Sequence, residues 1–170
     1  MADVEQRLRD TAARLKATPE TVLSKVDQTL EKLKLQDREL EQLRMKLATQ
    51  AGGDLLDQAV EVSGVRLLAT TLDGADPKTL RDTLDRIKQR LGSGVIVLAT
   101  VRDDKVNLIA GVTDDLTARV KAGDLIGFVA TQVGGKGGGR PDMAQAGGTQ
   151  PASLPSALAS VQQWLTEQLA

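Results

Sequence analysis

VGGKGGGRPDMAQAGG, the stretch from Val133 to Gly148, contains seven glycines in sixteen residues. Glycine tolerates positive φ and close backbone approach, so this density predicts a shaped turn or surface where side chains would obstruct. Successive backbone N–H groups can also form a concavity that binds an anion. The stretch carries two basic residues, Lys136 and Arg140, ahead of its single acid. Phosphate or nucleic acid is therefore the first ligand class that it suggests.

A flexible connector is the other common meaning of a glycine-rich run. This run has no serine, contains Pro141 and Asp142, and is followed by a further predicted helix over 154–169. Its spacing matches neither the phosphate-binding G-x-x-x-x-G-K-[ST] motif nor a strand–G-x-G-x-x-G–helix unit. We therefore expect a shaped loop whose ligand no generic motif identifies.

Composition narrows the function classes. The 170 residues suit one domain with an extension, or two small domains. Cysteine and histidine are both missing, which excludes disulfides, thiol nucleophiles, Cys/His zinc sites and histidine acid–base pairs. The 22 basic and 23 acidic residues exclude a polycationic grip on nucleic acid, so RNA binding would need a local patch and moderate salt dependence. With no leader and no membrane-length apolar run, a soluble, cytoplasmic protein is expected.

Residues 1–53 are predicted to form a helical arm, either a helical hairpin or a coiled coil. Apolar residues recur every three or four positions from Val4 to Leu15, as on one face of a helix. Thr18 and Pro19 suit the N-cap and first position of a second helix, which would run to about residue 49 and stop at Gly52-Gly53. Residues 52–56 would then be a hinge.

The second helix carries leucines at seven-residue spacing, interrupted at Asp37, with charged residues on its flanks. This pattern is typical of a coiled coil, and the shorter first helix can cover only part of it. A second subunit is the predicted neighbour of the remainder, although an isolated hairpin or a truncated partner also fits. The expected dimerisation residues are Val26, Leu30, Leu33, Leu40, Leu43 and Leu47.

Residues 54–170 are predicted to form an α/β (α+β) domain, with a mixed sheet covered by helices. Apolar runs predict strands at 59–62, 65–70, 95–99 and 105–112, the last two as a hairpin turning at Asp103-Asp104. Asp76-Pro77 predicts a helix start by its cap and proline. Further helices are expected over 114–120 with Thr113 as cap, from Asp124 to the glycine stretch, and over 154–169, where Trp164 would be a packing anchor.

These segments together resemble the C-terminal, C-Ala part of bacterial alanyl-tRNA synthetase, which joins a helical arm to a globular DHHA1-type module. The resemblance rests on GGKGGGRPDMAQAGG at 134–148 and GVTDDLTARVKAGDLIGFVATQV at 111–133. GVRLLATTL at 64–72 and VIVLATV at 95–101 also look like that family. It covers essentially the whole chain.

The resemblance implies a tRNA-binding and dimerisation module with no catalytic residue, metal or cofactor of its own. The parent enzyme attaches alanine to tRNA with ATP and magnesium and clears mischarged tRNA in a zinc-containing editing domain, and those ligands are expected only in the full-length enzyme. The implied partners are tRNA(Ala), held at its outer corner, a second copy bound through the arm, and the remainder of the synthetase. No membrane is implied.

Recognition of a tRNA corner should depend on shape, backbone and stacking, which a glycine surface with flanking cations can provide. The expected nucleic-acid-binding residues are Gly134, Gly135, Lys136, Gly137, Gly138, Gly139, Arg140, Gln145, Gly147 and Gly148. Arg119 and Lys121 either extend this patch or form a solvated helix end, which is the preferred interpretation. Met143 is expected to be an apolar plug.

Two alternatives come from other function classes. The DHHA1 module also accompanies DHH phosphoesterases, so the chain could bind a phosphate or nucleotide, with Asp103-Asp104 or Asp114-Asp115 holding a metal. Both acid pairs fit a turn or a helix start equally well. The remaining alternative is a purely structural dimerisation module whose glycine stretch binds nothing.

Overall fold

The computed structural model describes the backbone elements of the chain and the side chains of residues 1–47 and 55–170. The chain divides into two compact units, Met1–Arg44 and Met45–Ala170. This division lies earlier in the chain than the predicted boundary at residue 53.

The first unit contains helix α1 (Ala2–Arg14) and the first part of helix α2 (Val22–Leu56). The predicted cap at Thr18 and helical Pro19 are wrong, because residues 18–21 form a turn ahead of α2. In that turn the backbone N–H of Thr18 donates to Oγ1 of Thr21 at 3.0 Å, and Thr21 N–H donates to the Thr18 carbonyl. The side-chain hydroxyl of Thr21 therefore stabilises the turn from which the helix starts.

Contact between α1 and α2 is concentrated at this turn. Ala12 and Val22 are buried there, whereas Val4 and Leu8 of α1 remain exposed. The first helix therefore leaves the leucines of α2 uncovered. The predicted helix end at Gly52-Gly53 and the hinge over 52–56 are wrong, since α2 ends at Leu56. The side chains of residues 48–54 lie outside the described residues.

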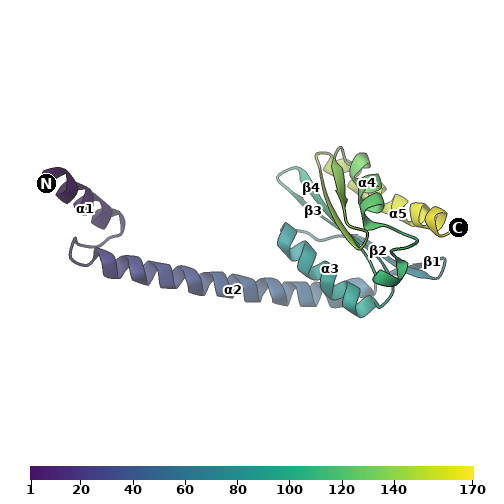
Figure 1. Ribbon diagram of the computed structural model, residues 1–170, viewed down its shortest axis with the longest axis horizontal. Coiled ribbons are helices and arrows are strands. Elements are labelled where there is room, and N and C mark those ends of the chain that lie inside the picture. Colours follow the sequence, from purple (N-terminus) through teal and green to yellow (C-terminus); the bar gives the residue numbers. More distant parts are fainter. The chain divides into compact units, whose positions relative to one another are not determined.

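The second unit is a mixed sheet with helices on both faces, as predicted (Figure 1). In the described part of the chain six strands take the order β1-β2-β3-β4-β6-β5. The strands are β1 (Val60–Val62), β2 (Val65–Thr71), β3 (Gly94–Arg102), β4 (Lys105–Val112), β5 (Lys136–Gly139) and β6 (Met143–Gly148). The helices are α3 (Pro77–Leu91), α4 (Ala122–Gln132) and α5 (Leu154–Leu169), with 3-10 turns η1 (Asp114–Leu116) and η2 (Pro151–Ser153).

Strand pairing follows from the connections. The β2 and β3 strands are parallel and are joined through α3, as a crossover requires. The other pairs are antiparallel. The β3–β4 hairpin turns at Asp103 and Asp104, whose φ values of +50° and +58° suit a tight hairpin turn. That hairpin and its turn confirm the prediction from sequence.

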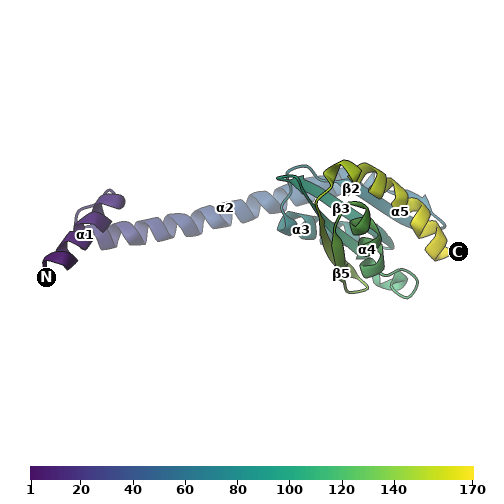
Figure 2. The same ribbon diagram turned by 90° about the horizontal axis from the view of Figure 1, so that it is seen from above.

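Two apolar cores lie on opposite faces of the sheet. Figures 1 and 2 show the helices that cover these faces. Helices α4 and α5 cover one face, where Val95, Val97 and Leu108 point toward them. Helix α3 and Leu55 at the end of α2 cover the other, against Ile96, Leu98 and Ile109. The fully buried, aliphatic β3 strand thus forms the centre of the domain, as its continuous apolar run predicts.

Local signals placed the start of α3 and both ends of α5 correctly. Asp76 caps α3 by accepting from the Thr79 N–H at 2.7 Å, and α5 has its predicted bounds. The predicted helix over 114–120 is wrong, because only the 3-10 turn η1 forms there. Helix α4 begins at Ala122 rather than at Asp124. The Thr113 hydroxyl accepts from the Gly94 N–H at 3.0 Å instead of capping a helix.

Thr100, on the α3 face of β3, offers a test of the buried core. Its hydroxyl is fully buried and has no hydrogen-bond partner among the described residues. Because an unsatisfied buried hydroxyl is costly, Thr100→Val should raise the free energy of unfolding by about 1 kcal/mol, measured by denaturant titration. Thr113→Val is the matched control and should lower it, because the Thr113 hydroxyl bonds both backbone groups of Gly94. Equal effects of the two substitutions would contradict this interpretation.

Candidate nucleic-acid interface

The glycine stretch folds as an antiparallel hairpin, β5–β6, at one edge of the sheet. The expectation of a loop is wrong, because β6 pairs along β4 and β5 pairs along β6. The hairpin turns at Pro141 and Asp142, and the Ala122 N–H of α4 donates to the Pro141 carbonyl at 2.8 Å. A hairpin that is hydrogen-bonded to β4 and to α4 is not a flexible connector. The glycine stretch therefore has a defined structure, as predicted, but that structure is a β-hairpin and not a loop.

One group of glycines lies where the hairpin leaves no room for side chains. A Cβ on Gly137 would lie 2.2 Å from the Ala146 Cβ, and one on Gly139 would lie 2.8 Å from the Ala144 Cβ. Similar crowding holds at Gly135 against Gly147 and at Gly148 against Val133. Close packing within the domain therefore explains these glycines, because any side chain there would meet a neighbouring segment before it met a ligand.

A second pair, Gly138 and Gly147, lies on the opposite side of the hairpin. A Cβ on Gly138 would meet nothing within 4 Å, and one on Gly147 would meet only the Val106 carbonyl at 3.6 Å. Neither residue has positive φ, unlike Gly134 at +70°. Neither packing nor backbone conformation therefore requires glycine at these two positions. This is the property expected where another molecule approaches the backbone.

The open glycines belong to a surface that no helix covers. Strand register places Gly138 beside Gln145, and Lys136 beside Gly147, on the side of the sheet that bears α3. All four residues are exposed. We call this surface the glycine ledge and define it as Lys136, Gly138, Gln145 and Gly147.

The two predicted cations of the stretch differ in availability. Lys136 forms no ion pair with any residue that the structure describes. Arg140 binds Asp142 through two bonds, Nε to Oδ1 at 3.0 Å and Nη2 to Oδ2 at 3.1 Å. One edge of the Arg140 guanidinium is therefore occupied by Asp142. Its Nη1 end takes part in neither bond.

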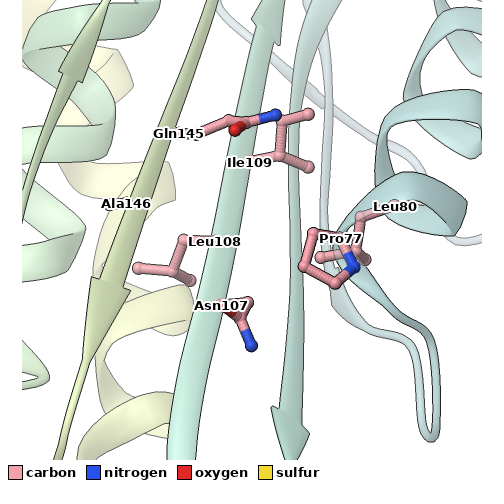
Figure 3. Close-up of a pocket in the computed structure, with 7 residues that line it drawn as sticks. All are labelled: Pro77, Leu80, Asn107, Leu108, Ile109, Gln145 and Ala146. Carbon is pink, nitrogen blue, oxygen red and sulfur yellow. The ribbon is translucent and has the colours of Figure 1, made fainter. Parts of the chain in front are cut away.

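Helix α3 stands beside the ledge. Its Lys88 Nζ donates to the Asp142 carbonyl at 3.3 Å, next to the hairpin turn. Near its other end a small pocket lies beside strands β4 and β6, and Figure 3 shows the residues that line it. The pocket is lined by Pro77, Leu80, Asn107, Leu108, Ile109, Gln145 and Ala146. The sequence did not identify Asn107 of β4 as a candidate site residue, because only the strand register reveals that it lies beside Gly147.

Other residues singled out in the sequence have structural roles. Arg119 Nη2 donates to the Leu169 carbonyl at 2.8 Å, so it satisfies the C-terminal end of α5, where a cation is favourable. Lys121 is the N-cap residue of α4. Trp164 stacks on Phe128 with ring centroids 5.8 Å apart, confirming a packing role. Met143 is partly buried against the α3-side core, as expected of an apolar plug.

The paired acids are used locally. Asp103 and Asp104 form the β3–β4 turn, and Asp115 accepts a hydrogen bond from Ser93. Side-chain hydrogen bonds from Ser93 and Thr113 hold the pKa of Asp115 below its ordinary value. Within the described residues no group of three or more His, Cys, Asp or Glu side chains is placed to hold a metal. Nor does any described helix have the length and apolar composition to cross a bilayer.

The predicted dimerisation residues form an exposed stripe along α2. Leu30, Leu33, Leu40, Leu43 and Leu47 are each at least half exposed, and Val26 is half-buried. Large apolar side chains exposed in a row at helical spacing mark an interaction surface more often than a free one.

Comparison with known proteins identifies the protein family that this chain matches. The DHHA1 domain model matches residues 64–167. The alanine–tRNA ligase of Burkholderia cenocepacia is 56% identical over 167 residues, which are 98% of this chain and 19% of the ligase. The chain thus spans about a fifth of the length of the curated relatives it matches.

Solved structures agree with this match. The crystal structure of the C-Ala domain from Aquifex aeolicus alanyl-tRNA synthetase is 30% identical with a TM-score of 0.61, over 64% of this chain and 97% of that chain. The structure of a DHH domain from a member of a family of ribosomal proteins is 14% identical with a TM-score of 0.52, over 85% of this chain and 34% of that chain. At that identity the likeness is one of fold alone.

Proposed function

We propose that this chain, which belongs to the DHHA1 domain family, is a tRNA-binding and dimerisation module of an alanine–tRNA ligase. In this role the glycine ledge holds the outer corner of tRNA(Ala), and aminoacylation and editing are carried out by other parts of the ligase. The chain itself contributes binding and needs no cofactor. The family match and the ledge geometry support the proposal independently.

The observation that carries the proposal is the open space above Gly138 and Gly147. A flat base or base pair can approach peptide planes closely only where Cβ atoms are missing. Both glycines are exposed on an edge hairpin that is paired with β4 through β6. Recognition by shape and stacking also suits a chain with a net charge of −1, which lacks the positive charge for a purely electrostatic grip.

Lys136 supplies the first prediction for this role. As a ledge cation with no described ion pair, it is placed to contact a phosphate beside a bound base. Lys136→Ala should lower the slope of log affinity against log salt by about one, in titrations with tRNA(Ala) at several ionic strengths. Arg119→Ala is the matched control, since Arg119 is engaged with α5, and it should leave the slope unchanged. An unchanged slope for Lys136→Ala would remove this residue from the interface.

The stripe on α2 supports the second part of the proposal, a homodimer. Leu33, Leu40 and Leu47 keep seven-residue spacing, and acidic and basic residues are interspersed around them. Such a surface is complementary to a second copy of itself, because apolar positions pack as a coiled coil while mixed charges flank the seam. A second copy is therefore the occupant that we infer for this face.

A further inference from the structure

We propose that the pocket between α3 and the glycine ledge is a hydrogen-bonding site for the polar edge of a nucleotide base, with Asn107 as a new specificity-determining residue. This inference rests on the proposed function, because it extends the tRNA surface from the ledge toward α3. It assigns a role to a residue on β4, outside the glycine stretch.

The pocket contains two carboxamides on neighbouring strands. Asn107 pairs with Gly147, and Gln145 lies two residues before Gly147 on β6, so both amides occupy the same side of the sheet. Figure 3 shows the two side chains on adjacent strands, with Pro77 and Leu80 of α3 beside them. Asn107 is half-buried, and neither amide group forms a hydrogen bond with any residue that the structure describes.

Carboxamides present a donor and an acceptor side by side, which is the arrangement that recognises base edges. A pocket with an apolar wall and a few converging polar groups is also typical of a ligand site. This pocket is too small for a whole base, so it would receive only an edge or an exocyclic group. The base itself would lie over Gly147, where the missing side chain leaves room.

The charge around the pocket favours RNA as the occupant. Helix α3 carries five basic residues and two acidic ones, against a net charge of −1 for the whole chain. Helical spacing places Arg81 on the same flank of α3 as Pro77 and Lys88, which border β6 and its turn. Arg81 is exposed and forms no ion pair within the described residues, including none with Asp85 one turn along. Arg81 can thus neutralise a phosphate next to α3, whereas Lys136 would contact a phosphate next to β5.

The test is a titration of tRNA(Ala) with the full chain and its Asn107→Ala variant at several salt concentrations. We expect about tenfold weaker binding, because a hydrogen bond to a base is lost, with an unchanged salt slope, because the neutral Asn107 side chain releases no counterion. Arg81→Ala should instead lower the slope by about one. Gln162→Ala removes an exposed amide from α5, on the other face of the sheet, and should change neither quantity.

The outcomes separate this inference from the proposed function. Wild-type affinity for Asn107→Ala, together with a lowered salt slope for Lys136→Ala, would overturn the Asn107 site and leave the ledge standing. No change in either variant would overturn both. If Asn107→Ala is unstable by thermal denaturation, Asn107→Val supplies a residue that is favoured in strands and cannot hydrogen-bond, and it must show the same tenfold loss. Near-wild-type affinity for a folded Asn107→Val protein would instead reject hydrogen bonding of a base by the Asn107 amide.

Discussion

Gly138→Val is expected to weaken tRNA(Ala) binding by about a hundredfold while the domain remains at least as stable as before. The valine side chain would project into the open space above the ledge and hold a base away from the peptide planes. Loss of stacking and backbone contacts of roughly 3 kcal/mol corresponds to that change in affinity. Stability should not fall, because a β-branched residue suits a strand better than glycine and a Cβ added at Gly138 has no atom within 4 Å.

Two other glycines provide controls for this substitution. Gly127 lies on α4, and a Cβ added there would have no atom within 4 Å, so Gly127→Ala should stabilise the domain by about 0.5–1 kcal/mol and leave binding unchanged. Gly137→Ala places a Cβ 2.2 Å from the Ala146 Cβ and should destabilise the domain. Wild-type binding by a folded Gly138→Val protein would contradict the proposed ledge.

Leu33→Glu combined with Leu40→Glu is expected to convert the proposed homodimer into monomers at micromolar concentration. Both leucines lie on the α2 stripe, and in a coiled coil each would bury a large apolar side chain worth about 2 kcal/mol or more. Placing two carboxylates in the seam adds the cost of desolvating charge. Sedimentation equilibrium over a range of concentrations measures the change in association directly.

Leu35→Glu is the control for the stripe. Leu35 is as exposed as its neighbours, at 58%, but it lies two residues from Leu33 and so points to another side of the helix. Its substitution should leave association unchanged. A wild-type chain that is monomeric throughout the concentration range, or a double variant that associates as the wild type does, would reject α2 as the dimer contact.

The sequence was informative wherever a local rule governs the structure. Asp76 and Pro77 placed the start of α3, the apolar run from Val95 placed the central strand, and the C-Ala resemblance identified the fold. Local rules failed where two residues compete for one role. Thr18 and Thr21 are both plausible caps, and the structure uses the Thr21 hydroxyl to form a turn before the helix begins.

The candidate site was less accessible from sequence because it depends on strand pairing. Glycine density correctly indicated close backbone approach, yet it does not distinguish Gly137, crowded by Ala146, from Gly138, which faces open space. Only the register of β5 on β6 separates them, and only the pairing of β4 with β6 brings Asn107 to the same surface. The bond between Arg140 and Asp142 likewise requires the hairpin geometry, although the two residues are close in sequence.

Hydroxyl-radical footprinting of tRNA(Ala), with and without this chain, tests the proposed function most directly. We expect protection confined to the outer corner of the L, where the tertiary-paired loops meet, and loss of that protection with Gly138→Val at the same protein concentration. Protection of the acceptor stem or anticodon arm instead, or a corner footprint that Gly138→Val leaves intact, would contradict recognition of the tRNA corner by the glycine ledge.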